Sequence, residues 1–290
     1  MIDWIKIHTQ YILPKHLISR LLGFIAEKEL GILTQSLIKL FIKAFNINMQ
    51  EAEFESPTEY KTFNEFFTRP LKTGLRTIVA GENTLCHPVD GAVSQFGDIK
   101  GDRIFQAKGH EYSLTALLGG KPEIAKAFKN GKFATIYLAP RDYHRIHMPI
   151  SGQLTDTLHV PGELFSVNPL TAQNVPGLFA RNERVVALFD TPAGKVAMVL
   201  VGATVVASIE TVWQGTVSPP AGKYVQHWQH EVDNILLNKG DEMGRFKLGS
   251  TVILCFEENK INFTDVSAGM TTRLGQQLAL LQETKSEKAE

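Results

Sequence analysis

Three short stretches of the sequence carry side chains that could do acid–base or nucleophilic chemistry. "HPVDGAV" places Asp90 in an Asp-Gly turn, and "APRDYHRIHMP" places His144 and His147 three residues apart. "KLGST" places Ser250 after Gly249, at the start of the β-branched run "STVILCF". A serine hydroxyl activated by a histidine, which an aspartate orients, is the logic of nucleophilic catalysis. Asp90, His147 and Ser250 supply these groups in chain order.

Each stretch also has a plain structural interpretation. Asp-Gly is a turn signal, and Gly-Ser before a strand lacks the G-x-S-x-G elbow of a hydrolase. His144 and His147 could bind a metal, act as general acid or base near neutral pH, or be structural histidines. No compact third metal ligand accompanies them. The residue types alone leave these alternatives open.

The composition is that of a globular protein. Hydrophobic residues make up 43% of the 290 residues, which is enough to build a core. Lys and Arg number 30, as do Asp and Glu, so no overall charge points to nucleic acid. Two cysteines, Cys86 and Cys255, are too few for a disulfide framework, and Cys255 fits a small buried apolar residue. We therefore expect a reducing compartment.

The first fifty residues differ from the rest of the chain. "HLISRLLGFIAEKEL" and "ILTQSLIKLFIKAF" carry apolar residues at helical spacing, within a mildly basic and aromatic segment. Such helices either cover a core or lie in a membrane interface. The start shows no signal-peptide pattern, and no run reaches the roughly 18 apolar residues of a spanning helix. The apolar stripe of the second helix comprises Leu37, Ile38, Phe41, Ile42 and Phe45.

Strand signals dominate the remaining chain. "KFATIYLAP", "GQLTDTLHV", "RVVALFD" and "STVILCF" are rich in β-branched and aromatic residues, and "DTPAGK" predicts a hairpin turn. "SLTALLGG" and "PEIAKAFKNG" predict short helices that end at glycine. The predicted class is α+β. N-terminal amphipathic helices occupy residues 1–60, and a mostly antiparallel β-rich domain with short helices occupies residues 61–290.

Together these stretches resemble the phosphatidylserine decarboxylase family of pyruvoyl-dependent lipid enzymes. The match extends from "FNEFFTRPLK" to "FKLGSTVILCF", and "LGST" is the form of the bacterial-type enzymes. The resemblance implies conversion of phosphatidylserine to phosphatidylethanolamine and CO2 in phospholipid biosynthesis. Between these ends the matching stretches are "HPVDGAV", "KGHEYSL", "YLAPRDYHRIHMP", "PGELFSVNP" and "KGDEMGRFKLGSTV".

The resemblance further implies that the chain cuts itself between Gly249 and Ser250. Ser250 Oγ would attack the Gly249 carbonyl, His147 would take the hydroxyl proton, and Asp90 would orient His147. Ser250 would become a covalent pyruvoyl group, the expected cofactor, which acts as an electron sink. No metal and no pyridoxal phosphate are expected. The products would be a β chain of residues 1–249 and an α chain of residues 250–290.

The resemblance also assigns binding roles. His144 would donate the proton that completes decarboxylation. In "GELFSVNP", Ser166 would bind the headgroup phosphate and Phe165 would contact an acyl chain, although Ser166 fits an ordinary loop cap equally well. Residues 1–60 would dock the enzyme peripherally on the cytoplasmic face of the cell membrane, where its substrate lies. The expected partner is the other cleavage fragment in an α/β heterodimer, which could itself dimerise, and no nucleic acid is expected.

Two rival functions use the same residues. A Ser-His-Asp hydrolase would attack a bound ester with Ser250 and would keep its chain intact. A non-enzymatic β-rich carrier or membrane-docking module would use the histidines only as structural residues. A metal site at His144 and His147 is a third, weaker alternative, and it predicts loss of activity with chelators.

Overall fold

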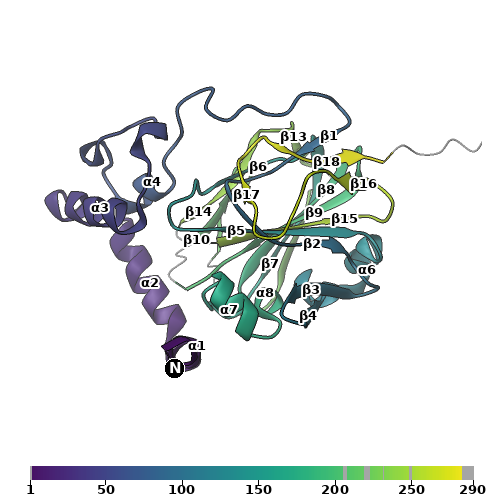
Figure 1. Ribbon diagram of the computed structural model, residues 1–290, viewed down its shortest axis with the longest axis horizontal. Helices are drawn as coiled ribbons and strands as arrows, with labels where there is room; N and C mark the ends of the chain where they lie inside the picture. Colours follow the sequence, from purple (N-terminus) through teal and green to yellow (C-terminus); the bar gives the residue numbers. More distant parts are fainter. Residues whose placement is uncertain (1, 205–207, 219–222, 231, 248–249, 283–290) are drawn as a thin grey trace, which may run out of the picture.

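The computed structural model describes residues 2–204, 208–218, 223–230, 232–247 and 250–282 (Figure 1). Its N-terminal helices project from a body built of antiparallel strands and short helices. The predicted α+β class is therefore confirmed. The N-terminal helical elements are α1 (Ile2–Ile12), α2 (Lys15–Ala26), α3 (Ile32–Phe45), η1 (Met49–Glu51), η2 (Pro57–Glu59) and α4 (Phe63–Phe67).

The N-terminal helices begin and end where local chemistry requires. Pro14, which lacks a backbone N–H, separates α1 from α2. α3 spans the residues that the apolar spacing predicts, and Asn46 ends it in the left-handed conformation. α4 starts at a capping box, in which Thr62 and Glu65 each satisfy a backbone N–H of the other. α1, which lies before the two predicted helices, is an additional element.

The apolar stripe of α3 faces the protein. Ile38 is fully buried, and Phe41 and Ile42 pack beside it against the phenylalanines of α4. The rings of Phe41 and Phe63 meet edge to face, with centroids 5.1 Å apart. The stripe therefore covers a core, while other apolar side chains of α3 remain exposed. These exposed side chains are Ile32, Leu33 and Leu40, joined by Leu37 and Phe45 at the edges of the stripe.

A large antiparallel sheet forms the centre of the molecule. Within the described residues its strands follow the order β12-β7-β8-β9-β15-β5-β2-β17, with β13 paired to β7. All seven residues of β15 are buried between β9 and β5, as a continuous run of β-branched and apolar residues predicts. The strands are β2 (Gly91–Asp98), β5 (Lys132–Leu138), β7 (Gly152–Val160), β8 (Arg184–Thr191), β9 (Gly194–Val201), β12 (Gln226–Gln229), β13 (Leu236–Leu237), β15 (Ser250–Phe256) and β17 (Thr271–Thr272).

Two hydrophobic cores lie on opposite faces of this sheet. Side chains alternate along a strand, so Ile253 and Cys255 join one core while Val252 and Leu254 join the other. Cys255 is thus the buried apolar residue that the sequence predicts. The predicted hairpin turn connects β8 to β9 at residues 191–194.

Short helices and a hairpin cover the first core, and two smaller sheets cover the second (Figure 1). The elements on the first core are β3 (Arg103–Ala107), β4 (His110–Ser113), α5 (Leu114–Leu117), α6 (Pro122–Ala125), η3 (Lys126–Phe128), α7 (Pro169–Asn174) and α8 (Leu178–Arg181). Those on the second are β11 (Gly215–Ser218), β10 (Ser208–Thr211), β14 (Glu242–Lys247) and β6 (Arg145–His147), then β1 (Thr84–Cys86), β18 (Gln277–Leu281) and β16 (Ile261–Phe263).

Candidate active site

One edge of the central sheet gathers the predicted site residues. Ser250 opens β15 and pairs with Leu138, the last residue of β5. Asp90 directly precedes β2, the neighbour of β5. The segment after β5 carries His144 and His147, and its strand β6 pairs with β14, the strand that comes before Ser250 in the chain. Residues far apart in the sequence are therefore placed at one end of neighbouring strands.

Ser250 is fully buried, and its hydroxyl has no hydrogen-bond partner among the described residues. Leaving a buried hydroxyl unpaired costs roughly 1–3 kcal/mol. Native proteins seldom retain such a group without a reason, and a reactive role is one such reason. Gly249, the other half of the predicted cleavage site, lies outside the described residues.

The His147 ring is held in one tautomer. Its Nδ1–H donates to the backbone carbonyl of Gly240 at 2.8 Å, and the Tyr143 hydroxyl donates to Nε2 at 3.3 Å. The proton therefore sits on Nδ1, and Nε2 keeps a lone pair that can accept a proton. Burial lowers the pKa of His147, which favours this neutral form.

Asp90 is held by partners other than His147. Arg76 donates to its two carboxylate oxygens from Nε at 3.0 Å and from Nη2 at 2.6 Å, and the Leu274 N–H donates at 2.8 Å. In the part of the chain that the structure describes, no hydrogen bond joins Asp90 to His147. Burial dominates the lowered pKa of His147, and the charges of Glu242 and, to a smaller extent, Asp90 raise that pKa in opposition. Asp90 therefore acts on His147 through its charge.

His144 is more deeply enclosed than His147. Its Nδ1–H donates to the carbonyl of Asp142 at 2.8 Å, and its ring packs on Phe67 with centroids 4.1 Å apart. Its Nε2 is buried without a partner among the described residues. Burial lowers the pKa of His144 to about 3, and the nearby positive charge of Arg69 acts in the same direction. His144 is therefore a neutral imidazole with a free Nε2 lone pair.

These buried histidines predict acid instability. Burial lowers the pKa of His144 to about 3 and that of His87 to about 4, and it also lowers the pKa of His147. In the unfolded chain a histidine has a pKa near 6.5. As the pH falls below 6.5, these histidines become protonated in the unfolded chain but stay neutral in the folded chain. His144 and His87 then each destabilise the fold by up to about 1.4 kcal/mol per pH unit, and His147 acts in the same direction. We expect the melting temperature to fall steadily from pH 7 to pH 5.5, where carboxylates contribute little.

Thermal unfolding across this pH range measures the slope, and a His87→Ala variant provides the comparison. Removing His87 should reduce the dependence of stability on pH by the contribution of one titrating group. This holds whatever the effect of the substitution on stability at pH 7. A melting temperature that does not change between pH 7 and pH 5.5 would contradict the assignment of neutral buried histidines.

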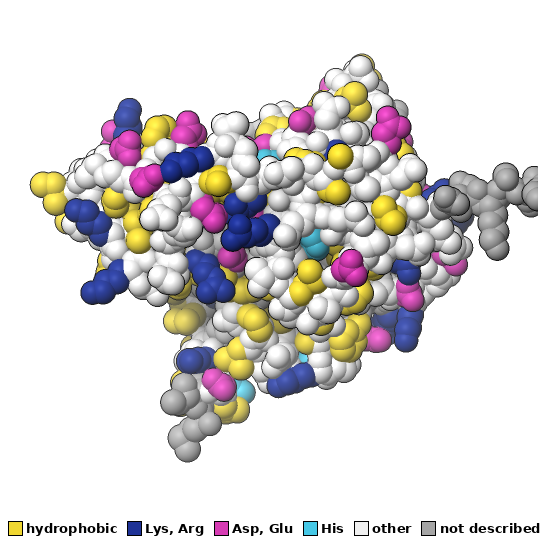
Figure 2. Space-filling view, turned by 45° about the horizontal axis from the view of Figure 1, so that its top comes forward, with side chains coloured by type: hydrophobic (Ala, Val, Ile, Leu, Met, Phe, Trp, Pro, Cys, Tyr) yellow, Lys and Arg dark blue, Asp and Glu magenta, His cyan; other side chains and the backbone are white. Residues whose placement is uncertain are grey.

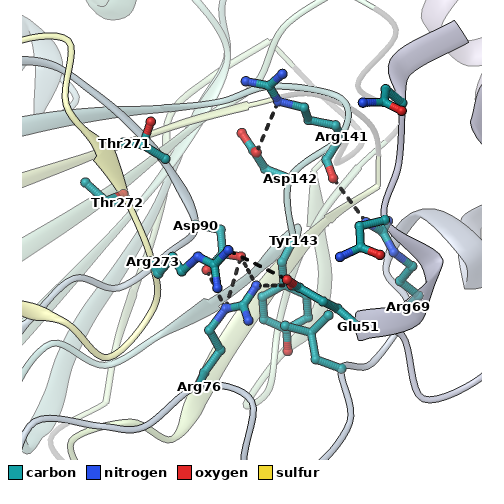
Figure 3. A pocket seen from close by; sticks show the side chains of 13 residues that line it. Glu51, Arg69, Arg76, Asp90, Arg141, Asp142, Tyr143, Thr271, Thr272 and Arg273 are labelled. Atoms are coloured by element: carbon teal, nitrogen blue, oxygen red, sulfur yellow. Dashed lines mark hydrogen bonds and ion pairs between the residues drawn. The ribbon is translucent and has the colours of Figure 1, made fainter.

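A polar pocket of about 230 Å³ adjoins Asp90 (Figure 3). Residues 271–273 and the connection that follows α3 lie on opposite sides of the pocket, and the segment after β5 lies between them. Four arginines outnumber the three carboxylates on its walls, so the pocket favours an anion. The charged residues are Arg69, Arg76, Arg141, Arg273, Glu51, Asp90 and Asp142.

Among these four arginines, Arg69 is the one for which no carboxylate partner is found within the described residues. It is 3% exposed, and its Nη2 donates to the Arg141 carbonyl at 3.1 Å. Its Nε and Nη1 have no hydrogen-bond partner within the described ranges. Arg76, in contrast, is paired with Asp90 and with Glu51 at 2.5 Å. A buried guanidinium with unused donors is suited to a phosphate or carboxylate.

The loop with Phe165 and Ser166 lies beside the Ser250 end of the sheet. Asn182 Nδ2 donates to the Phe165 carbonyl and to the Gly202 carbonyl, each at 2.8 Å. Gly202 follows Val201, which ends β9 and pairs with the residue after Ser250. The Phe165 ring is fully buried, and Ser166 Oγ accepts a 3.5 Å hydrogen bond from the Asn168 N–H. This geometry suits a loop cap and leaves the predicted lipid contacts untested.

Comparison with known proteins identifies the family. The phosphatidylserine decarboxylase family model matches residues 63–280, and a second family model, described as PSD, matches residues 5–46. A phosphatidylserine decarboxylase proenzyme from Alteromonas mediterranea is 67% identical over 282 residues, covering 96% of this chain and 87% of its own. One from Pseudoalteromonas atlantica is 68% identical over 284 residues, covering 97% and 99%. The chain belongs to the phosphatidylserine decarboxylase family.

Family membership makes the chain an enzyme of phospholipid synthesis that decarboxylates phosphatidylserine and is made as a proenzyme. No helix within the described ranges is both long and apolar enough to span a bilayer. The described residues also contain no group of three or more His, Cys, Asp or Glu side chains that could hold a metal ion.

The sequence motifs do not indicate several charged residues that line the polar pocket beside Asp90. Arg69 and Arg76 were not predicted as site residues, although "FNEFFTRPLK" belongs to the family resemblance. An arginine two residues after a cluster of phenylalanines is a usable signal, because its charge must find a partner among apolar neighbours. The Gly240 carbonyl that orients His147 leaves no signal, since every residue has a carbonyl.

Proposed function

We propose that the chain cuts itself between Gly249 and Ser250 and decarboxylates phosphatidylserine with the pyruvoyl group formed from Ser250. The observation that supports this most is the buried, unpartnered Ser250 hydroxyl at the start of the central strand. Two histidines with unprotonated Nε2 atoms lie on the segment that follows its partner strand. An unpaired hydroxyl alone does not distinguish Ser250, since the Ser208 hydroxyl also has no partner among the described residues. It is the combination of the unpaired hydroxyl with the nearby histidine segment that supports a reacting group.

Self-cleavage follows from these groups without an external reagent other than water. His147 Nε2 takes the Ser250 hydroxyl proton and Oγ attacks the Gly249 carbonyl. The imidazolium then gives that proton to the Ser250 nitrogen as the C–N bond breaks, which moves the acyl group from nitrogen to oxygen. The charge of Asp90 stabilises the His147 imidazolium. Loss of the Cα proton expels the Gly249 carboxylate and leaves dehydroalanine. Tautomerisation and addition of one water then release one ammonia and leave the pyruvoyl group.

The pyruvoyl group supplies an electrophilic carbonyl that condenses with the serine amine of the lipid and accepts the electron pair as CO2 leaves. His144 is the proposed donor of the proton that replaces CO2. Because Nδ1–H is bound to the Asp142 carbonyl, Nε2 must first gain a proton. Burial and the charge of Arg69 lower the pKa of His144 and so oppose this step. The anionic headgroup of phosphatidylserine beside Arg69 would offset that charge and raise the pKa of His144.

The cleaved chains are proposed to remain one αβ heterodimer. β15, β17 and β18 belong to the smaller fragment, yet they pair with β9, β5, β2 and β1 of the larger one. The boundary between a helical segment of residues 1–60 and a catalytic domain of residues 61–290 is part of the same proposal.

Residues 1–60 are proposed to hold the enzyme peripherally on the cytoplasmic face of the cell membrane. Figure 2 shows hydrophobic side chains exposed on the projecting N-terminal helices, with Lys and Arg beside them. Such surfaces bind anionic bilayers through apolar burial and charge together. Vesicle binding that survives removal of residues 1–46 would contradict this placement. The exposed apolar residues include Trp4, Ile12, Leu17, Phe24, Ile32, Leu33 and Leu40.

The intact mass of the purified wild-type protein under denaturing conditions tests the proposed function. We expect two fragments, residues 1–249 and 250–290, with the smaller one lighter than its sequence by one ammonia. A hydrolase or a docking module would give one full-length chain, even after incubation with phosphatidylserine vesicles. Two fragments without the ammonia loss would indicate simple hydrolysis and contradict the pyruvoyl group.

A further inference from the structure

The turn between α1 and α2 is bound tightly to the loop that borders the Ser250 site. Lys15 is only 7% exposed, which is unusual for a lysine. Its ammonium donates to Glu163 Oε2 at 2.8 Å and to the Gln10 carbonyl at 2.9 Å. Arg181 donates to the other oxygen of Glu163 at 3.1 Å. Glu163 therefore joins an N-terminal helix to the body of the enzyme.

The same turn encloses the Phe165 ring. The Lys15 ammonium lies 3.6 Å from the ring centroid, and the Arg181 guanidinium lies 4.8 Å from it. Tyr11 meets the ring edge to face at 5.0 Å. Cation–π contacts of this kind gain strength when they are desolvated, as here, where the ring is fully buried. The orientation of Phe165 therefore depends on residues of α1 and α2.

Gln10 fixes the neighbouring backbone. Its Oε1 accepts a hydrogen bond from the Ser166 N–H at 2.9 Å, and its Nε2 donates to Thr171 Oγ1 at 3.2 Å. The Phe165 carbonyl also accepts a hydrogen bond from the Thr204 N–H at 3.3 Å. The loop is thus held from one side by α1 and from the other by the segment after β9, next to Ser250.

We propose that Lys15 is a positioning residue that sets the Phe165–Ser166 loop against the Ser250 end of the sheet. The helices that present the exposed apolar surface would thereby also determine the shape of the substrate site. This inference rests on the proposed function, because it assumes that the loop borders a lipid headgroup. The positioning role of Lys15 differs from a docking role, in which the N-terminal helices would only attach the enzyme to the bilayer.

Lys15→Met tests the inference while preserving the fold. Methionine keeps the aliphatic contact with Phe165, and Glu163 keeps Arg181 as its partner. Lys6→Met is the matched control, because it removes an exposed lysine from the same helical segment. We expect Lys15→Met to be processed and to bind phosphatidylserine vesicles as well as Lys6→Met does. Its kcat/KM should fall about ten- to hundredfold, since small misplacements of positioning groups have effects of this size.

The decisive substrate is a short-chain phosphatidylserine below its critical micelle concentration, for which membrane attachment is irrelevant. A positioning role predicts that the loss persists with this substrate and that Lys15→Arg recovers part of it. Glu163→Gln should give a loss of its own, and the double variant should lose less than the sum of the two. A loss seen only with vesicles, or equal activity of Lys15→Met and Lys6→Met, would overturn the inference. An uncut wild-type chain would instead refute the proposed function.

Discussion

Ser250→Ala is expected to leave the chain in one piece and without decarboxylase activity. The substitution removes the atom proposed to attack the Gly249 carbonyl, and it also removes the precursor of the pyruvoyl group. Loss of a nucleophile costs at least about a thousandfold in rate, and here no second route supplies the electrophile. The measurement is intact mass together with CO2 release from phosphatidylserine vesicles.

The same variant should be at least as stable as the wild-type precursor. Alanine removes a buried hydroxyl that has no hydrogen-bond partner among the described residues, which relieves a cost of roughly 1–3 kcal/mol. Ser208→Ala is the matched control, because Ser208 is also buried at the start of a strand with an unpartnered Oγ among the described residues. It should be cut and active. A Ser250→Ala chain that still splits at this bond, or still releases CO2, would contradict the proposal.

His144→Ala is expected to separate the two reactions. The variant should be cut like the wild type, because His147 supplies the base for cleavage. Decarboxylation should then fall about 10²- to 10⁴-fold, the usual contribution of a positioned proton donor. Intact mass reports the first step and CO2 release the second.

His87→Ala is the control for His144→Ala. His87 is likewise a buried histidine whose ring nitrogens have no partner in the described part of the chain. Its replacement should leave both reactions near the wild-type level. If His144→Ala stays uncut while His87→Ala is cut, the division of roles between His144 and His147 is wrong.

The sequence predicted the elements that depend on local pattern. The run from Ser250 to Phe256 is the buried central strand, and residues 32–45 form one helix. The placement of Asp90, His144 and Ser250 at one sheet edge required the family resemblance, because strand order is decided by contacts between remote segments. Local periodicity contains no such information.

Two features of the site could not be predicted. The partner that orients His147 is a carbonyl 93 residues away, and backbone groups are the same at every position. The partner of Asp90 is Arg76, which lies in an irregular connection without periodicity. The apolar stripe of α3 was ambiguous for a related reason. Periodicity shows that a face is apolar, but it does not show whether protein or lipid covers that face.

Because β15 lies between β9 and β5, the order of folding and chain cleavage matters for this protein. Before the cut, the central strand reaches its place as part of one chain, and folding is independent of concentration. After the proposed cut at Gly249–Ser250, the same strand would belong to a separate short chain, and recovery from denaturant would become a second-order assembly of two polypeptides. The sheet must therefore be complete before the chain is severed. Under this proposal the mature enzyme would stay folded because it unfolds slowly, since its two chains would no longer refold as one polypeptide.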